Sequence, residues 1–386
     1  MNFCQHRIES IRRYVCYKSS CTPFNLDAAW ADIQQTCAYN AGKTTTYTLT
    51  YIDNPVGTAD AVRVAINAPG GKLYMLPYNG TSTIELDTAT DSTTVITGTQ
   101  SQLSSAPKIF GACYVDNAFY CMSYENKAIY KFDLSNKTYS QLTTVSNQYM
   151  GLCYDGSTYI YSLSFDTSGK ILRYNVKTNA VEEISGLTNE YNKYQRLQLH
   201  PNGKLYASPQ YYNKIIELDP NDIQNPVYFT GYRVHRSCYC CLTADGNIAI
   251  APWETNQNGT QNATTANVET KVVTYAPGNL YSSTGFALTS NIVLPPTGTP
   301  LLLPQSYNGI FVYDTSHNSV TKIGQTQYSN NGYAYYYHSG ILAANNSAYC
   351  CPGRTANVKI LKISINIAGG RNFKETTILS PFLNNY

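Results

Sequence analysis

Apolar and polar residues alternate in short runs over most of this chain, and the runs come in pairs joined by turn residues. The clearest pairs are GKLYMLPYNGTSTIELD at Gly71–Asp87 and GKLYASPQYYNKIIELD at Gly203–Asp219, with weaker copies at Ala118–Leu134 and Thr158–Val176. A period of two residues predicts half-buried β-strands, because successive side chains of a strand point to opposite faces. Helices would instead require apolar residues at i, i+3 and i+4.

The spacing of the copies predicts the architecture. An acidic or amide residue ends the second run at Asp87, Asp133, Asn175 and Asp219, at intervals of 46, 42 and 44 residues. Three further copies follow, which gives seven between about Ala61 and the C-terminus. Units of this length with several short strands are typical of β-propeller blades. We therefore predict an all-β fold: a seven-bladed β-propeller of four-stranded blades over residues 58–386, with a short helical N-terminal arm.

Each blade should contain an inner strand, a GKLYMLP-type strand, a TIELD-type strand and a Thr-rich outer strand. Propellers usually close their ring with a strand from the other terminus, and Thr44–Ile52 is the candidate. It would add to a last blade whose own outer strand is predicted at Lys374–Ser380. The recurrent Asp87, Asp133 and Asp219 occupy equivalent positions, so we expect them to cap turns rather than to act as paired acids.

Residues 1–57 differ from the repeat and form the predicted arm, which contains one extended strand. The pattern predicts a helix within Phe3–Tyr17 and a second helix over Leu26–Cys37, with Asn25 as its N-cap. Such short helices are not stable alone in water. They must pack on the propeller, on each other or on a partner, and in the last case the arm would dock the propeller to a larger assembly.

Composition excludes several classes of function. Charged residues make up 13% of the chain and the net charge is +3, which gives no basis for nucleic-acid binding. No segment reaches the ~20 apolar residues that span a bilayer, and the first residues lack the apolar region of a signal peptide. Without a signal peptide reduced thiols are favoured, although the N-terminal cysteines are spaced widely enough to form disulfides. Cys113, Cys121, Cys153, Cys240 and Cys350 are expected to be small buried hydrophobes. The histidines are scattered, so we expect neither a metal site nor a cofactor.

A search for catalytic motifs assigns no catalytic residue. The chain contains no nucleophile elbow, P-loop, HExxH or dinucleotide-binding glycine turn. Acids spaced by whole blades do not provide the two carboxyl groups within about 5–10 Å that glycoside hydrolysis requires. We therefore expect that the protein is not an enzyme.

The turn between the second and third strands of each blade is rich in aromatic and amide residues, and these turns should lie on one face of the disc. Aromatic rings with polar tips, together with Asn amides, suit binding to sugars or to a partner protein. The alternative is that the turn recurs for folding reasons, since Asn favours left-handed backbone geometry. The candidate binding residues are Tyr78, Asn79, Tyr124, Asn126, Tyr211, Tyr212, Asn213, Trp253, Tyr307, Asn308 and Arg354.

Two copies carry a family resemblance. Residues Gly71–Thr94, preceded by Ala68–Pro69, and residues Pro201–Pro220 resemble the APNGKIYxIPYNxxxVxxIDPxTD repeat of β-propeller proteins from phages and large DNA viruses. The chain is more distantly similar to kelch and YncE-like propellers, although the kelch double glycine and the WD dipeptide do not recur. The resemblance implies a propeller fold and a viral or phage setting, and it carries over no catalytic residue.

Together these observations favour a non-enzymatic virion protein with a structural or host-attachment role in a phage or large virus. Its propeller would bind a neighbouring structural protein or a host surface glycan, and its N-terminal arm would bind other virion proteins. Two alternatives stay open: a propeller-type carbohydrate-active enzyme, such as a lyase or glycosidase, and a kelch-like interaction scaffold located in the cytoplasm.

Overall fold

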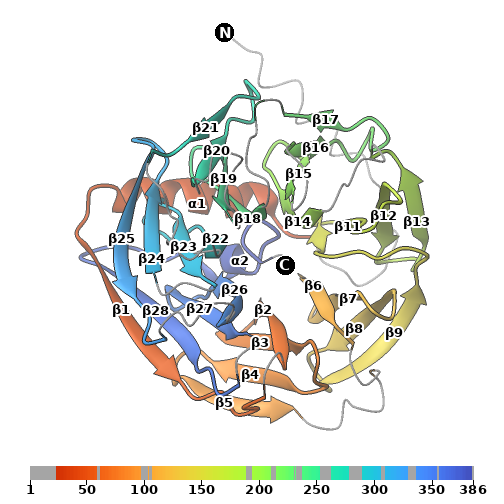
Figure 1. Ribbon diagram of the computed structural model, residues 1–386, viewed down its shortest axis with the longest axis horizontal. Helices are drawn as coiled ribbons and strands as arrows, with labels where there is room; N and C mark the ends of the chain where they lie inside the picture. Colours follow the sequence, from red (N-terminus) through yellow and green to blue (C-terminus); the bar gives the residue numbers. More distant parts are fainter. Residues whose placement is uncertain are drawn as a thin grey trace.

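Seven four-stranded antiparallel sheets stand around a common axis in this protein (Figure 1). The computed structural model describes residues 23–58, 61–96, 103, 107–187, 194–209, 214–229, 231, 237–252, 262–277, 289–305, 309–328, 336–353 and 356–384. The predicted seven-bladed β-propeller is confirmed. Inner strands such as β2 are buried over nearly their whole length, whereas the outer strand β5 alternates between exposed and half-buried residues and is buried only at its end.

Each of the first four blades runs from an inner to an outer strand in chain order. Blade 1 comprises β2 (Val62–Ala68), β3 (Lys72–Pro77), β4 (Thr83–Asp87) and β5 (Ser92–Ile96). Blade 2 comprises β6 (Ile109–Val115), β7 (Ala118–Ser123), β8 (Ala128–Asp133) and β9 (Thr138–Thr144). Blade 3 comprises β10 (Cys153–Tyr154), β11 (Tyr159–Leu163), β12 (Lys170–Asn175) and β13 (Val181–Ser185). Blade 4 comprises β14 (Tyr194–Leu199), β15 (Leu205–Pro209), β16 (Ile216–Leu218) and β17 (Val227–Tyr228).

The last three blades complete the ring. Blade 5 comprises β18 (Ser237–Leu242), β19 (Ile248–Pro252), β20 (Thr264–Ala266) and β21 (Val273–Tyr275). Blade 6 comprises β22 (Thr289–Val293), β23 (Leu301–Pro304), β24 (Gly309–Asp314) and β25 (Ser319–Gln325). Blade 7 comprises β26 (Tyr337–Leu342), β27 (Ser347–Pro352), β28 (Ile360–Ile367) and, as its outer strand, β1 (Thr45–Ile52).

The N-terminal strand closes the ring, as the sequence predicts. All eight residues of β1 pair with β28, from Thr45 opposite Ile367 to Ile52 opposite Ile360. The predicted outer strand at Lys374–Ser380 is wrong. Glu375–Ile378 instead forms a short helix, α2, because β1 already occupies the edge of β28 and Asp32 holds this segment. The Asp32 carboxylate accepts hydrogen bonds from the Lys374 backbone N–H and the Thr377 hydroxyl.

The recurrent Asp87, Asp133 and Asp219 cap turns, as the sequence predicts. Asp87 Oδ1 accepts hydrogen bonds from the backbone N–H groups of Ala89 and Thr90, and Asp133 Oδ1 does the same for Ser135 and Asn136. Asp219 accepts from the Asn221 N–H. One oxygen of each carboxylate is therefore occupied by its own turn.

Some of these turns also carry a side chain into the neighbouring blade. Four residues after the capping acid or amide the backbone is left-handed, for example at Asp91, Lys137 and Lys271. Lys137 of blade 2 binds Glu85 of blade 1 at 2.6 Å, and Lys271 of blade 5 binds Glu217 of blade 4. We call each such contact an inter-blade staple.

The same geometry occurs with reversed charges where the ring closes. Lys362 of blade 7 binds the Asp91 carboxylate of blade 1 at 2.7 Å, and the Tyr349 hydroxyl donates to the same carboxylate. The two copies with the strongest motif match, at blades 1 and 4, are those with a glutamate on the third strand. In both copies a lysine and a tyrosine of the second strand contact this glutamate, and the three shared residues thus have a structural role: Lys72, Tyr74 and Glu85 in blade 1, and Lys204, Tyr206 and Glu217 in blade 4.

Helix α1 (Leu26–Asn40) crosses one face of the disc, behind β18 and β19 in Figure 1. Asn25 caps it by accepting from the Ala28 N–H at 3.0 Å, as predicted. Its buried side chains pack against the turns that join first and second strands, where Asn40 donates to the Pro296 carbonyl. The predicted helix within Phe3–Tyr17 lies outside the described residues. No helix in the described part of the chain is long and apolar enough to cross a membrane.

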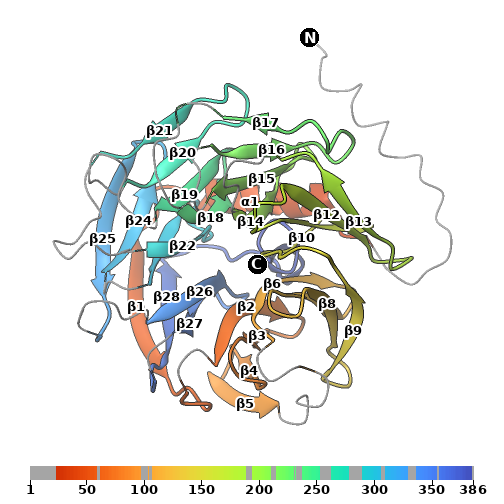
Figure 2. The same cartoon turned by 45° about the vertical axis from the view of Figure 1, so that its right-hand side comes forward.

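The C-terminal segment packs between α1 and the axis: α2 lies near the centre of the disc in Figure 1, and the C-terminal end of the chain lies near the centre in both views (Figures 1 and 2). The Phe382 ring meets Trp30 edge to face at 6.2 Å, and its carbonyl accepts from Gln198 of β14. Asn384 exchanges two hydrogen bonds with the backbone of Asn67 in β2. The axis is thus occupied by protein on the side of α1.

The strand cysteines are small core residues. Cys113, Cys121, Cys153, Cys240 and Cys350 are fully buried free thiols, as predicted. Burial raises the pKa of the Cys121 thiol, which suppresses formation of a reactive thiolate.

Candidate functional site

The turns between second and third strands lie on the face opposite α1, because antiparallel strands place alternate connections at opposite ends of a blade. On this side, several inner strands contain a β-bulge, where the register shifts by one residue. The bulge residue is Arg63 in β2, Phe110 in β6 and His338 in β26. A bulge redirects a side chain out of the regular alternation. Because the inner strands surround the axis (Figure 1), these side chains gather there.

Arg63, Tyr78, Phe110, Tyr124 and His338 form a contiguous group, which we call the axial cluster. The Arg63 guanidinium carbon lies 3.9 Å from the Phe110 ring centre and 5.0 Å from that of Tyr78. Tyr78 meets Phe110 edge to face at 5.2 Å and approaches the His338 ring at 6.1 Å. Phe110 in turn contacts Tyr124 at 5.3 Å.

An aromatic row extends the axial cluster across blades 2 and 3. It runs from Phe110 through Tyr124 of blade 2 to Phe165 of blade 3, which lies 5.9 Å from Tyr124. All three rings are half-buried, so each leaves part of its surface open to solvent. The face therefore offers flat apolar surface beside a cation.

Arg63 is the exceptional charge of this cluster. It makes no hydrogen bond or ion pair with any described residue, and its Nε is buried without an acceptor there. Nearby carboxylates are engaged elsewhere. Glu125 pairs with Lys108 at 2.8 Å, and Asp166 accepts from the backbone N–H groups of Gln148 and Ser168.

The structure separates the predicted residues into different roles. Tyr78 is only 9% exposed and forms a wall of the axial cluster, whereas Tyr124 is half-buried within the aromatic row. Burial raises the pKa of Tyr124, with the Glu125 charge adding to the effect, so its hydroxyl stays protonated. Asn79 is exposed. Asn126 serves its own turn, since its backbone N–H donates to Ser123 and its amide donates to the Tyr130 hydroxyl.

Phe110 therefore joins Tyr78 to Tyr124, while Asn79 and Asn126 are not part of this contact. The other predicted binding residues lie outside the described residues: Tyr211, Tyr212, Asn213, Trp253, Tyr307, Asn308 and Arg354.

Sequence reasoning missed Arg63, Phe110, His338 and Phe165. The available signal was a large or charged residue inside an otherwise apolar inner strand, as in VRVAINAP. The bulge that turns such a residue toward the axis depends on pairing with the next strand, which the pattern does not reveal.

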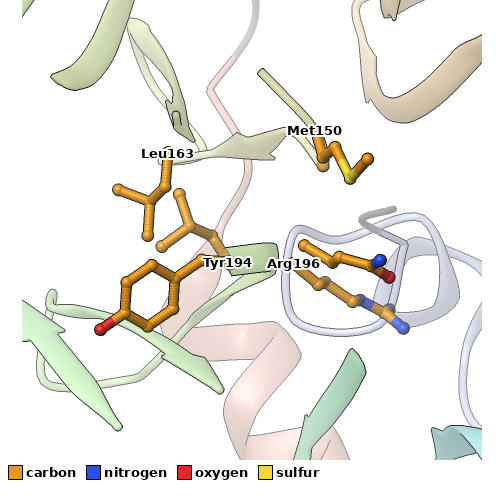
Figure 3. A pocket seen from close by; sticks show the side chains of 7 residues that line it. Met150, Leu163, Tyr194 and Arg196 are labelled. Atoms are coloured by element: carbon orange, nitrogen blue, oxygen red, sulfur yellow. The ribbon is translucent and has the colours of Figure 1, made fainter. Parts of the chain in front are cut away.

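Closer to α1, the axis is filled by protein. Figure 3 shows Arg196 and Met150 extending away from Leu163 and Tyr194, and the space among these side chains of blades 3 and 4 is too small to hold a water molecule. The Arg196 guanidinium approaches Asn291 Oδ1 at 3.4 Å, and the Asn291 amide donates to the Gly340 carbonyl. This space does not suit a sugar-sized ligand.

The chemistry of the axial cluster fits binding. Among the residues that the structure describes, no group of three or more His, Cys, Asp or Glu side chains could hold a metal ion. The cluster combines one cation, several rings and one imidazole, and the acids next to Tyr124 and Phe165 in the chain, Glu125 and Asp166, are engaged elsewhere. Cation–π contact and aromatic stacking both favour recognition of a flat or charged ligand.

Comparison with known proteins supports the fold. No family model matches the chain, and no curated protein matches it in sequence. Its structure is similar to a streptogramin B lyase, with a TM-score of 0.67 at 11% identity over 83% of this chain and 98% of that one. It is also similar to a catalytically inactive virginiamycin B lyase from Staphylococcus aureus with quinupristin, with a TM-score of 0.65 at 10% identity over 82% and 99% of the two chains.

A third similar structure is the extracellular domain of a two-component system protein from B. thetaiotaomicron, with a TM-score of 0.59 at 13% identity over 82% of this chain and 42% of that one. Identities this low show a shared propeller fold and leave function to be argued from the residues.

Proposed function

We propose that the protein is a non-enzymatic attachment protein of a phage or large-virus particle, and that the axial cluster and the aromatic row bind a host surface glycan. The main support is the run of half-buried rings from Phe110 to Phe165, which lies beside Arg63, a cation that no described side chain neutralises. Sugar rings pack well on such surfaces, because aromatic side chains offer flat apolar area at low entropic cost.

The proposed viral setting is supported by the repeat that resembles those of phage and large-virus propellers. The proposed anchor is the N-terminal arm. One side of α1 packs on the propeller, which leaves the opposite side available for other virion proteins. Its exposed residues include Gln34, Gln35 and Tyr39, the last at 43%.

Glycan binding and cleavage are tested on the same sample. Purified protein is incubated with host surface polysaccharide, and both retention and chain length are measured. We expect retention without shortening, and a Tyr124→Ala/Phe165→Ala variant should lose retention. A Tyr39→Ala variant, altered on the opposite face, is the matched control. Shortened or unsaturated chains would show a lyase or glycosidase and refute the non-enzymatic proposal.

The virion assignment has an independent test. Mass spectrometry of purified particles should detect the protein at a stoichiometric level, and a Gln34→Arg/Tyr39→Ala variant of α1 should be incorporated less. Absence of the protein from particles, with abundant protein in the host cytoplasm, would favour the interaction-scaffold alternative instead.

A further inference from the structure

We infer that Arg63 is the anion-binding residue of this face and that its ligand is the carboxylate of an acidic sugar, an inference that rests on the proposed glycan binding. The first argument is charge balance. The lysines of the inter-blade staples each contact a carboxylate, and Arg173 pairs with Glu182 at 2.6 Å. Arg63 has no such partner among the described residues, although its Nε is buried.

An unpaired, partly buried guanidinium is costly to retain. Removing a charge from water without a counter-ion is unfavourable, and a cation–π contact recovers only part of that cost. Arg63 has two such contacts, with Phe110 and Tyr78, which therefore do not fully compensate. A bound anion would supply the missing compensation.

The guanidinium is also held in place before any ligand arrives. The bulge at Arg63 lies between two regular pairs, Val62 with Pro77 and Val64 with Leu76, so its backbone position is fixed. The guanidinium carbon lies 3.9 Å from the Phe110 ring centre, and of its nitrogens only Nε is buried without a partner, so the edge that carries the two Nη groups is the one open to a ligand. This edge matches the two oxygens of a carboxylate, which can accept a pair of parallel hydrogen bonds.

The local charge favours a monoanion on a sugar. Lys108, whose backbone N–H donates to the Tyr78 carbonyl, is paired with Glu125. The described side chains of the axial cluster therefore provide about one net positive charge, which suits one carboxylate better than a doubly charged phosphate. Because the aromatic row begins at Phe110, a carboxylate on Arg63 would place the attached sugar rings over Tyr124 and Phe165.

A glycan array tests this assignment. The array carries uronic-acid, sialic-acid, sulfated and neutral glycans, and it is probed with the full-length wild type and an Arg63→Gln variant. Arg173→Gln is the matched control, since Arg173 also lies over a tyrosine ring, that of Tyr159, at 5.1 Å. We then titrate the best glycan against its methyl ester, which keeps the sugar ring and removes the charge. Thermal unfolding of each variant verifies that it is folded.

We expect the strongest binding to carboxylate glycans, at least a tenfold loss with Arg63→Gln or the methyl ester, and no change with Arg173→Gln. Arg63→Lys should recover only part of the affinity, because an ammonium lacks the planar fork. Binding to neutral glycans that Arg63→Gln leaves unchanged would overturn this inference and leave the proposed function standing. Preference for sulfated over carboxylate glycans would also overturn it. Binding to no glycan at all would reject both.

Discussion

Replacing Glu217 with Gln tests whether the inter-blade staple between blades 4 and 5 stabilises the ring. The Glu217 side chain is 3% exposed and accepts hydrogen bonds from Lys204, Lys271 and, at 2.8 Å, the Tyr206 hydroxyl. Glutamine has nearly the same size, so the substitution removes the charge with little change in packing. Two lysines would then remain without their carboxylate in a partly buried site.

The expected loss in unfolding free energy follows from the exposure of these groups. Removing one partner of a fully buried ion pair costs about 3–5 kcal/mol. Both lysine side chains are 32% exposed, so water partly compensates them, and we expect a loss of about 2–3 kcal/mol. Glu85 provides the matched control in blade 1. Its side chain is 14% exposed and its partner Lys137 is 42% exposed, so Glu85→Gln should cost only about 1 kcal/mol.

Urea unfolding monitored by tryptophan and tyrosine fluorescence measures both variants. The midpoint should fall more for Glu217→Gln than for Glu85→Gln, with the slope unchanged. Adding Lys271→Met to Glu217→Gln should restore part of the loss, because it removes one uncompensated charge. Equal midpoints for the two single variants would refute the reasoning that burial of the carboxylate sets the strength of a staple.

Three further predictions concern closure, the C-terminal segment and pH. Deleting residues through Ile52 removes all of β1, and circular dichroism should show loss of cooperative unfolding; an unchanged transition would mean that the ring does not depend on β1. Phe382→Ala should lower stability by about 3–5 kcal/mol by calorimetry, since its ring is 3% exposed against α1, and a loss below 1 kcal/mol would contradict the packing. Burial acts to raise the pKa of Glu85, but hydrogen bonds from Lys137 and Tyr74 outweigh it and hold the pKa below its usual range. The stability that Glu85 contributes is therefore fully present above about pH 4.3, its pKa in the unfolded chain. It is lost as the pH falls through the lowered pKa of the folded state. Acid titration of Glu85→Gln should show a shallower loss of stability than the wild type, and identical titrations would exclude this role.

Local pattern was sufficient for much of this fold. Alternation and spacing predict the blades, the capping role of Asp87 and its equivalents, the N-cap at Asn25 and the closing strand at Thr44–Ile52. Each of these depends on residues close together in the chain or on a repeat that marks equivalent positions. The error at Lys374–Ser380 arose because a Thr-rich segment with alternating character also suits a short helix, and contacts with Asp32 in α1 decide between the two.

The candidate site was less accessible to sequence reasoning. Tyr78 and Tyr124 were found because they recur in a turn, but the pattern gave them the same role. In the structure, Tyr78 is buried and forms one wall of the axial cluster, whereas Tyr124 is half-buried within the aromatic row. Phe110 and Arg63 were missed because they belong to different blades and come into contact only in the folded ring.

The sequence by itself determined the number of blades, the order of strands and the caps of their turns, because alternation and turn chemistry act between neighbouring residues. Only the tertiary structure decided which side chains share the axis. Arg63 and Phe110 lie 47 positions apart in the chain, and the inner strands β2, β6 and β26 each contribute one bulge residue to this end of the axis through pairing with their own neighbours. Ring closure then brings the bulge residues of blades 7, 1 and 2 together, and no local pattern encodes that proximity.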